Sequence, residues 1–143
     1  MTSPSDLTEI MIRDHLDSGG FLGPFTDILG GSQPAPLTQI GIFRDTDTES
    51  TSRIVLIRSD NAGGPSDDIY RIENMIISFI GLGNYDDWLI TKGRATQAHR
   101  WLLENFKSDC IINFDDISDV TGPYFTESDR PVAEMNFTLT LEA

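Results

Sequence analysis

The stretch DIYRIENMIISFIG, residues Asp68 to Gly81, is the longest apolar run of the chain and divides the sequence into two similar halves. Its second part crowds β-branched and aromatic residues together, which is typical of a strand covered on both faces. Its first part alternates, because Arg71 and Glu73 share one face while Ile72 lies on the other. We therefore predict a central strand that emerges from cover at its start. Its two covering layers must come from the helices or from a second copy of the chain.

Length and charge limit the possible functions. The 143 residues fit a single domain, residues 1–143, that can bury a hydrophobic core without disulfides or bound metals. Ten Lys and Arg against 23 Asp and Glu give a formal net charge of -13, which should repel nucleic acid and anionic membranes. Cys110 has no second cysteine to pair with, and the start of the chain lacks the pattern of a signal peptide. No apolar run approaches the roughly 20 residues of a membrane helix, so we expect no membrane partner.

The N-terminal region predicts a helix. Ser3 suits its N-cap, Pro4 its first position, and Gly19-Gly20 its end. His15 lies at the edge of the apolar stripe and is interpreted as a packing or surface residue.

The next segment, residues 19–36, is rich in Gly and Pro but also carries the apolar residues Phe21, Leu22 and Phe25. An apolar segment of this kind needs cover. We expect either a loop folded over its own core or a segment that docks on a neighbouring subunit.

Three strands are predicted in succession, Leu37 to Arg44, Arg53 to Arg58 and the central strand, and their spacing suggests a β-meander. The first two are joined by an acidic stretch that contains Asp45, Asp47 and Glu49. This stretch lacks the glycine and the final glutamate of a calcium loop, so we interpret it as an acidic hairpin tip.

A second helix is predicted from about Thr91 to Phe106. Its polar side carries Lys92, Arg94 and Arg100 beside the acidic pair Asp86-Asp87. These charges suggest local ion pairs or, alternatively, contact with an acidic neighbouring subunit. Helical spacing assigns the following residues to its apolar face: Ala95, Ala98, His99, Leu102, Leu103 and Phe106.

The last third returns to strands. A short strand, Cys110 to Phe114, precedes a long acidic connection with a turn at Gly122-Pro123, and Arg130 to Ala143 then alternates cleanly. The order of elements predicts an α+β fold, a mixed or antiparallel sheet with helices packed on one face.

The sequence contains almost no catalytic pattern. It has no phosphate-binding glycine loop, no CxxC, no HExxH and no GxSxG motif. Asp115, Asp116 and Asp119 could form a carboxylate site, but in so acidic a chain they are better explained as a solvated loop. We therefore expect no metal and no cofactor, and a structural or interaction protein rather than an enzyme.

The element order and the ending GPYFTESDRPVAEMNFTLTLEA resemble the tail terminator and minor tail proteins of long-tailed bacteriophages, the group of the lambda tail terminator and its prophage relatives. The resemblance spans nearly the whole chain and includes a terminal alternating strand preceded by Gly122, Asp129 and Arg130. Residues 19–36 depart from the family pattern by their length.

The resemblance implies a structural virion protein that forms a hexameric ring at the head-proximal end of the tail tube, after assembly in the host cytoplasm. Such a ring ends tube growth and offers a surface to the head. Its partners would be other copies of itself, the tail tube protein and a head-completion or connector protein, while DNA passes through without specific binding. The residues expected to face the lumen are Glu134, Asn136, Thr138 and Glu142. The residues expected to contact other subunits or the tube are Phe21, Leu22, Phe25, Asp45, Asp47, Glu49, Arg94 and Arg100.

Two alternatives stay open. The nearer one is another head–tail joining or tail tube protein of the same virion. The farther one is a small α+β enzyme or ligand-binding domain that uses four residues around a cleft near the start of the second helix: Asp86, Asp87, Arg94 and His99.

Overall fold

The computed structural model describes residues 7–41, 52–59, 70–107, 111–115 and 117–142. In chain order its elements are α1 (Thr8–Ser18), β1 (Phe25–Thr26), β2 (Ser32–Gln33), β3 (Leu37–Ile40), β4 (Ile54–Ser59), β5 (Tyr70–Ile80), the 3-10 turn η1 (Tyr85–Asp87), α2 (Trp88–Glu104), β6 (Ile111–Asp115), β7 (Thr121–Phe125) and β8 (Pro131–Glu142).

The main sheet has six strands. Its path runs β3-β4-β5-β8-β6, and β7 also pairs with β8, beside its first residues. β5 lies between β4 and β8 and is buried from Met75 to Ile80, which confirms the predicted central strand covered on both faces. Ile72 to Asn74 are only partly buried, as expected for the emerging start of the strand.

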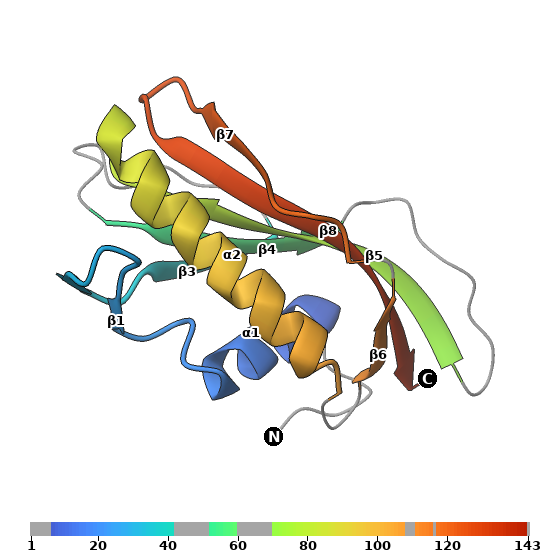
Figure 1. Cartoon of the computed structure of the whole chain (residues 1–143). Helices are drawn as coiled ribbons and strands as arrows, with labels where there is room; N and C mark the ends of the chain where they lie inside the picture. Colours follow the sequence, from blue (N-terminus) through green and yellow to red (C-terminus); the bar gives the residue numbers. More distant parts are fainter. Residues whose placement is uncertain (1–6, 42–51, 60–69, 108–110, 116, 143) are drawn as a thin grey trace.

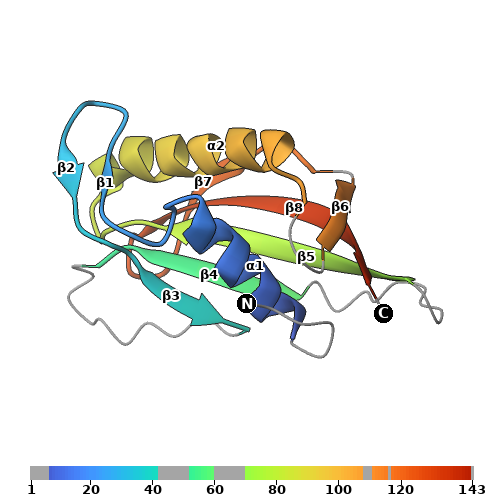
Figure 2. The ribbon, with the colours of Figure 1, turned by 90° about the horizontal axis from the view of Figure 1, so that it is seen from below.

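Both helices pack on one face of this sheet (Figures 1 and 2), which confirms the predicted α+β fold. Met11, Ile12 and Leu16 of α1 share one core with the odd-numbered residues of β5 from 75 to 79 and of β8 from 133 to 141. The alternation predicted for the last strand is confirmed, because its odd-numbered residues from Ala133 to Leu141 are all buried. A smaller apolar cluster lies on the opposite face and consists of Ile54, Leu56, Ile80 and Val132.

The predicted β-meander is wrong at its first step. β3 and β4 pair in parallel, with Leu37 opposite Ile54 and Ile40 opposite Ile57. The connection between them is therefore a crossover and not a hairpin, and residues 41–53 are long enough for one, since parallel strands need about a dozen connecting residues. Strand spacing in the sequence does not reveal strand direction. Asp45, Asp47 and Glu49 themselves lie outside the described residues.

The helix boundaries also differ from the prediction. Leu7 has extended backbone and precedes α1, so the helix begins at Thr8; Ser3 and Pro4 lie outside the described residues. α1 ends before Gly19, as predicted. Leu103 in α2 and Phe106 beyond its end are exposed rather than buried, and Thr91 lies on the buried face of the helix beside the two alanines and Leu102. The small side chains of Ala95 and Ala98 suit a helix that packs closely on β5 and β8.

Three strands were missed. The segment predicted as a long connection contains β7, in which Gly122 and Pro123 lie within the strand and not in a turn. The register shifts between Thr121 and Tyr124, and a bulge of this kind accommodates a proline that cannot donate a hydrogen bond. Within residues 19–36, β1 and β2 form a short antiparallel hairpin.

Candidate functional site

A buried ion pair joins the start of β4 to the start of α2. Arg53 donates from Nη2 to Oδ1 of Asp87 at 2.6 Å and from Nε to Oδ2 at 3.1 Å. The same Oδ2 accepts hydrogen bonds from the Leu82 amide at 2.8 Å and from Thr91 Oγ1 at 3.1 Å. Both charges are buried, and the forked geometry satisfies them together. The pair therefore fixes the position of the first turn of α2 on the sheet.

The same arginine reaches the β1–β2 hairpin. Its Nη1 donates to Gln33 Oε1 at 2.7 Å, and Gln33 Nε2 donates to Asp27 Oδ2 at 2.7 Å. Asp27 Oδ1 accepts hydrogen bonds from the amides of Leu29 and Gly31 at 2.8 and 3.1 Å. These bonds, with the one from Gln33 as the largest contribution, lower the pKa of Asp27. The turn of the hairpin is thus held by a chain of polar contacts that begins in the core.

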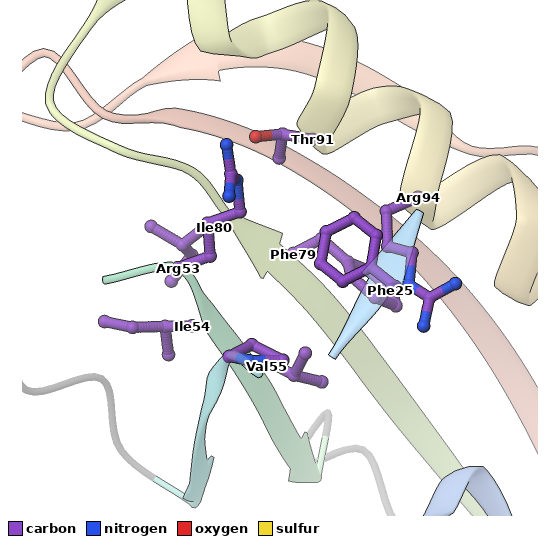
Figure 3. A pocket seen from close by; sticks show the side chains of 9 residues that line it. Phe25, Arg53, Ile54, Val55, Phe79, Ile80, Thr91 and Arg94 are labelled. Atoms are coloured by element: carbon purple, nitrogen blue, oxygen red, sulfur yellow. The ribbon is translucent and has the colours of Figure 1, made fainter. Parts of the chain in front are cut away.

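Arg94 of α2 holds the other side of the hairpin. Its guanidinium lies 4.5 Å from the ring centre of Phe21 and 4.3 Å from that of Phe25, and it donates to the Gly20 carbonyl at 3.0 Å. Figure 3 shows Phe25 and Phe79 next to each other, with Arg94 beside Phe25 and Val55 below. The cavity left at this junction has a volume of about 10 Å³, which is room for about one water. The junction is therefore closely packed and holds the hairpin against α2, and it has no room for a ligand.

On the outer side of α2 the surface is hollowed. We call this region the basic hollow; its volume is about 420 Å³ and its lining residues are Ile28, Trp88, Leu89, Lys92, Gly93, Thr96, Gln97 and Arg100. Ile28 and Trp88 are 47% and 41% exposed. Ile28 rests directly on the helix, since a Cβ atom at Gly93 would lie 2.8 Å from its side chain. Figure 2 shows the hairpin beside the N-terminal half of α2.

The face of the sheet opposite the helices carries a polar group around Glu134 of β8. Its Oε2 accepts a hydrogen bond from Ser78 Oγ at 2.9 Å and lies 3.9 Å from Arg58 Nη2. Burial, and then the hydrogen bond and negative charge of Glu134, raise the pKa of Tyr124. A second open hollow of about 400 Å³ lies over these four residues.

Two other residues expected to face a lumen, Asn136 and Thr138, share this face. Asn136 is exposed, and Thr138 is partly buried and donates to Asn74 Oδ1 at 2.8 Å. Glu142 belongs to β8, but its side chain lies outside the described part. The structure therefore brings Glu134, Asn136 and Thr138 to one surface.

The residues expected to make subunit contacts are dispersed. Phe21 is buried in the core, Leu22 packs against that core, and Phe25 stacks on Arg94. This part of the segment is thus folded over the chain's own core, as one of the two interpretations predicted. Arg100 alone among the predicted contacts is exposed within the described ranges.

The predicted local ion pairs of α2 are wrong for the described residues. Asp87 pairs with Arg53 of β4, Lys92 donates to the Gly122 carbonyl at 2.9 Å, and Arg94 stacks on aromatic rings. Because these charged residues are close in the sequence, they were expected to pair with one another. In the fold, Asp87, Lys92 and Arg94 instead point towards other elements. Trp88 and Ile28 were missed as surface residues, because an apolar side chain carries no sequence signal of exposure.

The four residues of the enzyme alternative have different neighbours. Asp87 faces Arg53 in the interior and Arg94 faces Phe21 and Phe25, while Asp86 is exposed and His99 is partly buried. Asp119 is exposed, whereas Asp116 and the side chain of Asp115 are outside the described part. In that part, no three potential metal-ligating side chains gather. The helices described there include none long and apolar enough to cross a membrane.

Comparisons with known proteins agree with the resemblance. The family described as phage tail termination protein matches residues 31–143, which covers the whole main sheet and α2 but not α1 or β1. Searches among curated proteins and solved structures found no match. The matched family is one of structural tail proteins, so its members act in the virion tail alongside other tail or head components. The chain belongs to the phage tail termination protein family.

Proposed function

We propose that this protein forms a ring at the head-proximal end of the phage tail tube, where it stops tube growth and offers a surface to the head-joining protein. The observation that carries this proposal is the family match over residues 31–143. Ring partners would be other copies of the chain, most simply six. Assembly would take place in the host cytoplasm before the tail joins the head.

The surface of the chain supports self-association. Exposed large apolar side chains gather at the β1–β2 turn and the start of α2, where Leu29 is 68% exposed and Trp88 41% exposed. Contiguous apolar surface on a soluble protein indicates an interaction site. A contact between two different patches is repeated from copy to copy and closes into a ring when its rotation angle allows.

The lumen would be lined by the sheet face that carries Glu134, Asn136 and Thr138. This face has no helix among the described residues and presents polar side chains along β8. Six copies would carry a formal charge of -78, six times -13. A negative channel repels phosphates, so DNA could pass without binding.

The test uses the purified protein and the tail tube protein of the same phage. Light scattering and electron microscopy should show finite rings of about six copies, alone or on the ends of tubes. Added in less than equal amount to polymerising tube protein, it should shorten the tubes. Incorporation along the tube as a filament subunit would instead support the alternative of a tube protein, and a monomer that ignores tubes would overturn the proposal.

A further inference from the structure

We propose that the basic hollow of one subunit receives the turn between β7 and β8 of the next copy in the ring. This proposal rests on the proposed ring function and names the contact that closes it. The occupant is a second copy of this chain, because the chain carries both complementary surfaces.

The basic hollow has the composition of a docking surface. Its lining combines the apolar side chains of Ile28, Trp88 and Leu89 with the cations Lys92 and Arg100. Arg100 is exposed and has no hydrogen bond or ion pair within the part of the chain that the structure describes. Apolar lining next to an unpaired cation fits a partner that presents an apolar side chain next to acidic ones.

The hollow is already ordered in the single chain. The side chain of Ile28 rests on Gly93, and the turn that carries it is held by the hydrogen bonds of Asp27. Gln33 and Arg53 connect this turn to the buried Asp87. A surface that is braced from the core loses little conformational entropy on binding, which favours docking.

The β7–β8 turn has the opposite character. Phe125 is 40% exposed beside the exposed acids Glu127 and Asp129. The turn is rigid too: Thr126 exchanges hydrogen bonds with Arg130, whose backbone amide donates to Thr126 Oγ1 at 3.2 Å and whose carbonyl accepts from the Thr126 amide at 2.9 Å. Arg130 is fully buried and donates from Nε to the Gly81 carbonyl at 2.8 Å. An aromatic side chain beside two acids complements the apolar and cationic side chains that line the hollow.

The net negative charge of each copy gives the contact between the hollow and the turn a role in assembly. Copies with a net charge of -13 repel one another, and a local contact of opposite sign offsets part of that repulsion. The hollow and the turn are different surfaces, so each subunit would offer its hollow to one neighbour and its turn to the other. Such a head-to-tail contact leaves no free patch once the ring closes.

The test is a charge exchange. Arg100→Glu and Glu127→Lys, each alone, should raise the concentration of half-assembly at least about tenfold, because each places like charges in contact. The combined variant R100E/E127K should return towards wild type. Matched controls are Arg13→Glu on α1 and Glu104→Lys at the end of α2, which should assemble normally. Circular dichroism and thermal melting would verify that every variant is folded.

The outcomes separate the two proposals. If wild type forms rings and both single variants assemble equally well, the contact proposed here is overturned while the ring function stands. If the single variants lose assembly and the combined variant does not recover, the specific pairing is also overturned. If wild type forms no ring even with tail tubes, the proposed function itself fails.

Discussion

Arg53 and Asp87 form a buried ion pair although they lie 34 positions apart in the sequence. No spacing pattern in the sequence predicts this pair. Asp87 also satisfies the Leu82 amide and the Thr91 hydroxyl. Removing one member of a buried ion pair leaves the other charge without compensation in the interior, which is far more costly than losing a surface pair.

Asp87→Ala should therefore lower the free energy of unfolding by about 3–5 kcal/mol. Chemical denaturation followed by circular dichroism would measure the change. The neighbouring Asp86 is exposed, and Asp86→Ala should change stability by less than about 0.5 kcal/mol. Equal effects of the two variants would contradict the assigned role.

His15 is a second buried polar residue, and it makes the stability of the protein depend on pH. Its Nε2 donates to the Asn105 carbonyl at 2.6 Å, and its ring lies between Trp101 and Phe114. Burial lowers the pKa of His15 below 6.5, although the bond to Asn105 opposes this shift. The unfolded chain therefore takes up a proton at a higher pH than the folded protein does, so stability is lost as the pH falls below about 6.5.

Denaturation at a series of pH values between 7.5 and 5 would detect this loss. A His15→Gln variant should lack that part of the pH dependence, because it has no imidazole to protonate. The chain's other histidine offers a matched control, and His99→Gln should retain the dependence. An unchanged pH profile in His15→Gln would exclude His15 as its origin.

At the scale of elements, the β1–β2 hairpin is joined to α2 through the stacking of Arg94 between Phe21 and Phe25. A double-mutant cycle with Arg94→Lys and Phe25→Leu should give a coupling energy of about 0.5–2 kcal/mol, since lysine keeps the charge but loses the planar contact. Arg100→Lys with Phe25→Leu is the matched control and should show no coupling. A coupling near zero for the first pair would mean that the hairpin is held by other contacts.

The elements differ in how far the sequence could predict them. β5 and β8 were predictable because every residue from Met75 to Ile80 except Ser78 is apolar and Ala133 to Leu141 alternates with period two. The direction of β3 was not predictable, since Leu37 to Ile40 would look the same in either orientation. β7 was hidden by Gly122 and Pro123, which normally mark turns.

The candidate surfaces were predictable only in part. Arg100 was predicted to be a contact residue, and its exposure is compatible with that role. Phe21 was chosen for the same role because its segment is apolar, but the fold uses it in the core. The basic hollow joins the turn at Ile28 to a helix that begins 60 positions later, at Trp88, and only tertiary structure brings these two together.

At the scale of the whole molecule, the negative net charge predicts that the protein does not bind DNA. Assembled rings of wild type should not retain duplex DNA on a filter or in a gel even at low salt, where electrostatic attraction would be strongest. Tight retention by wild type would overturn the proposed passage of DNA through the ring. Histone-like basic protein is a positive control for the assay.

The pairing of β8 with three other strands has a consequence for the order in which the backbone opens. β8 meets β5 from Ile80 opposite Val132 to Tyr70 opposite Glu142, and it also carries β6 and β7 on its other edge. Its central amides should therefore exchange with solvent deuterium only when the whole domain unfolds, whereas those of the edge strand β3 should exchange through local opening. Mass spectrometry of exchanged peptides should then find slow amide exchange along β5 and β8 and faster exchange in β3. A subunit with this pattern can open locally at the β3 edge of the sheet while its central strands stay paired.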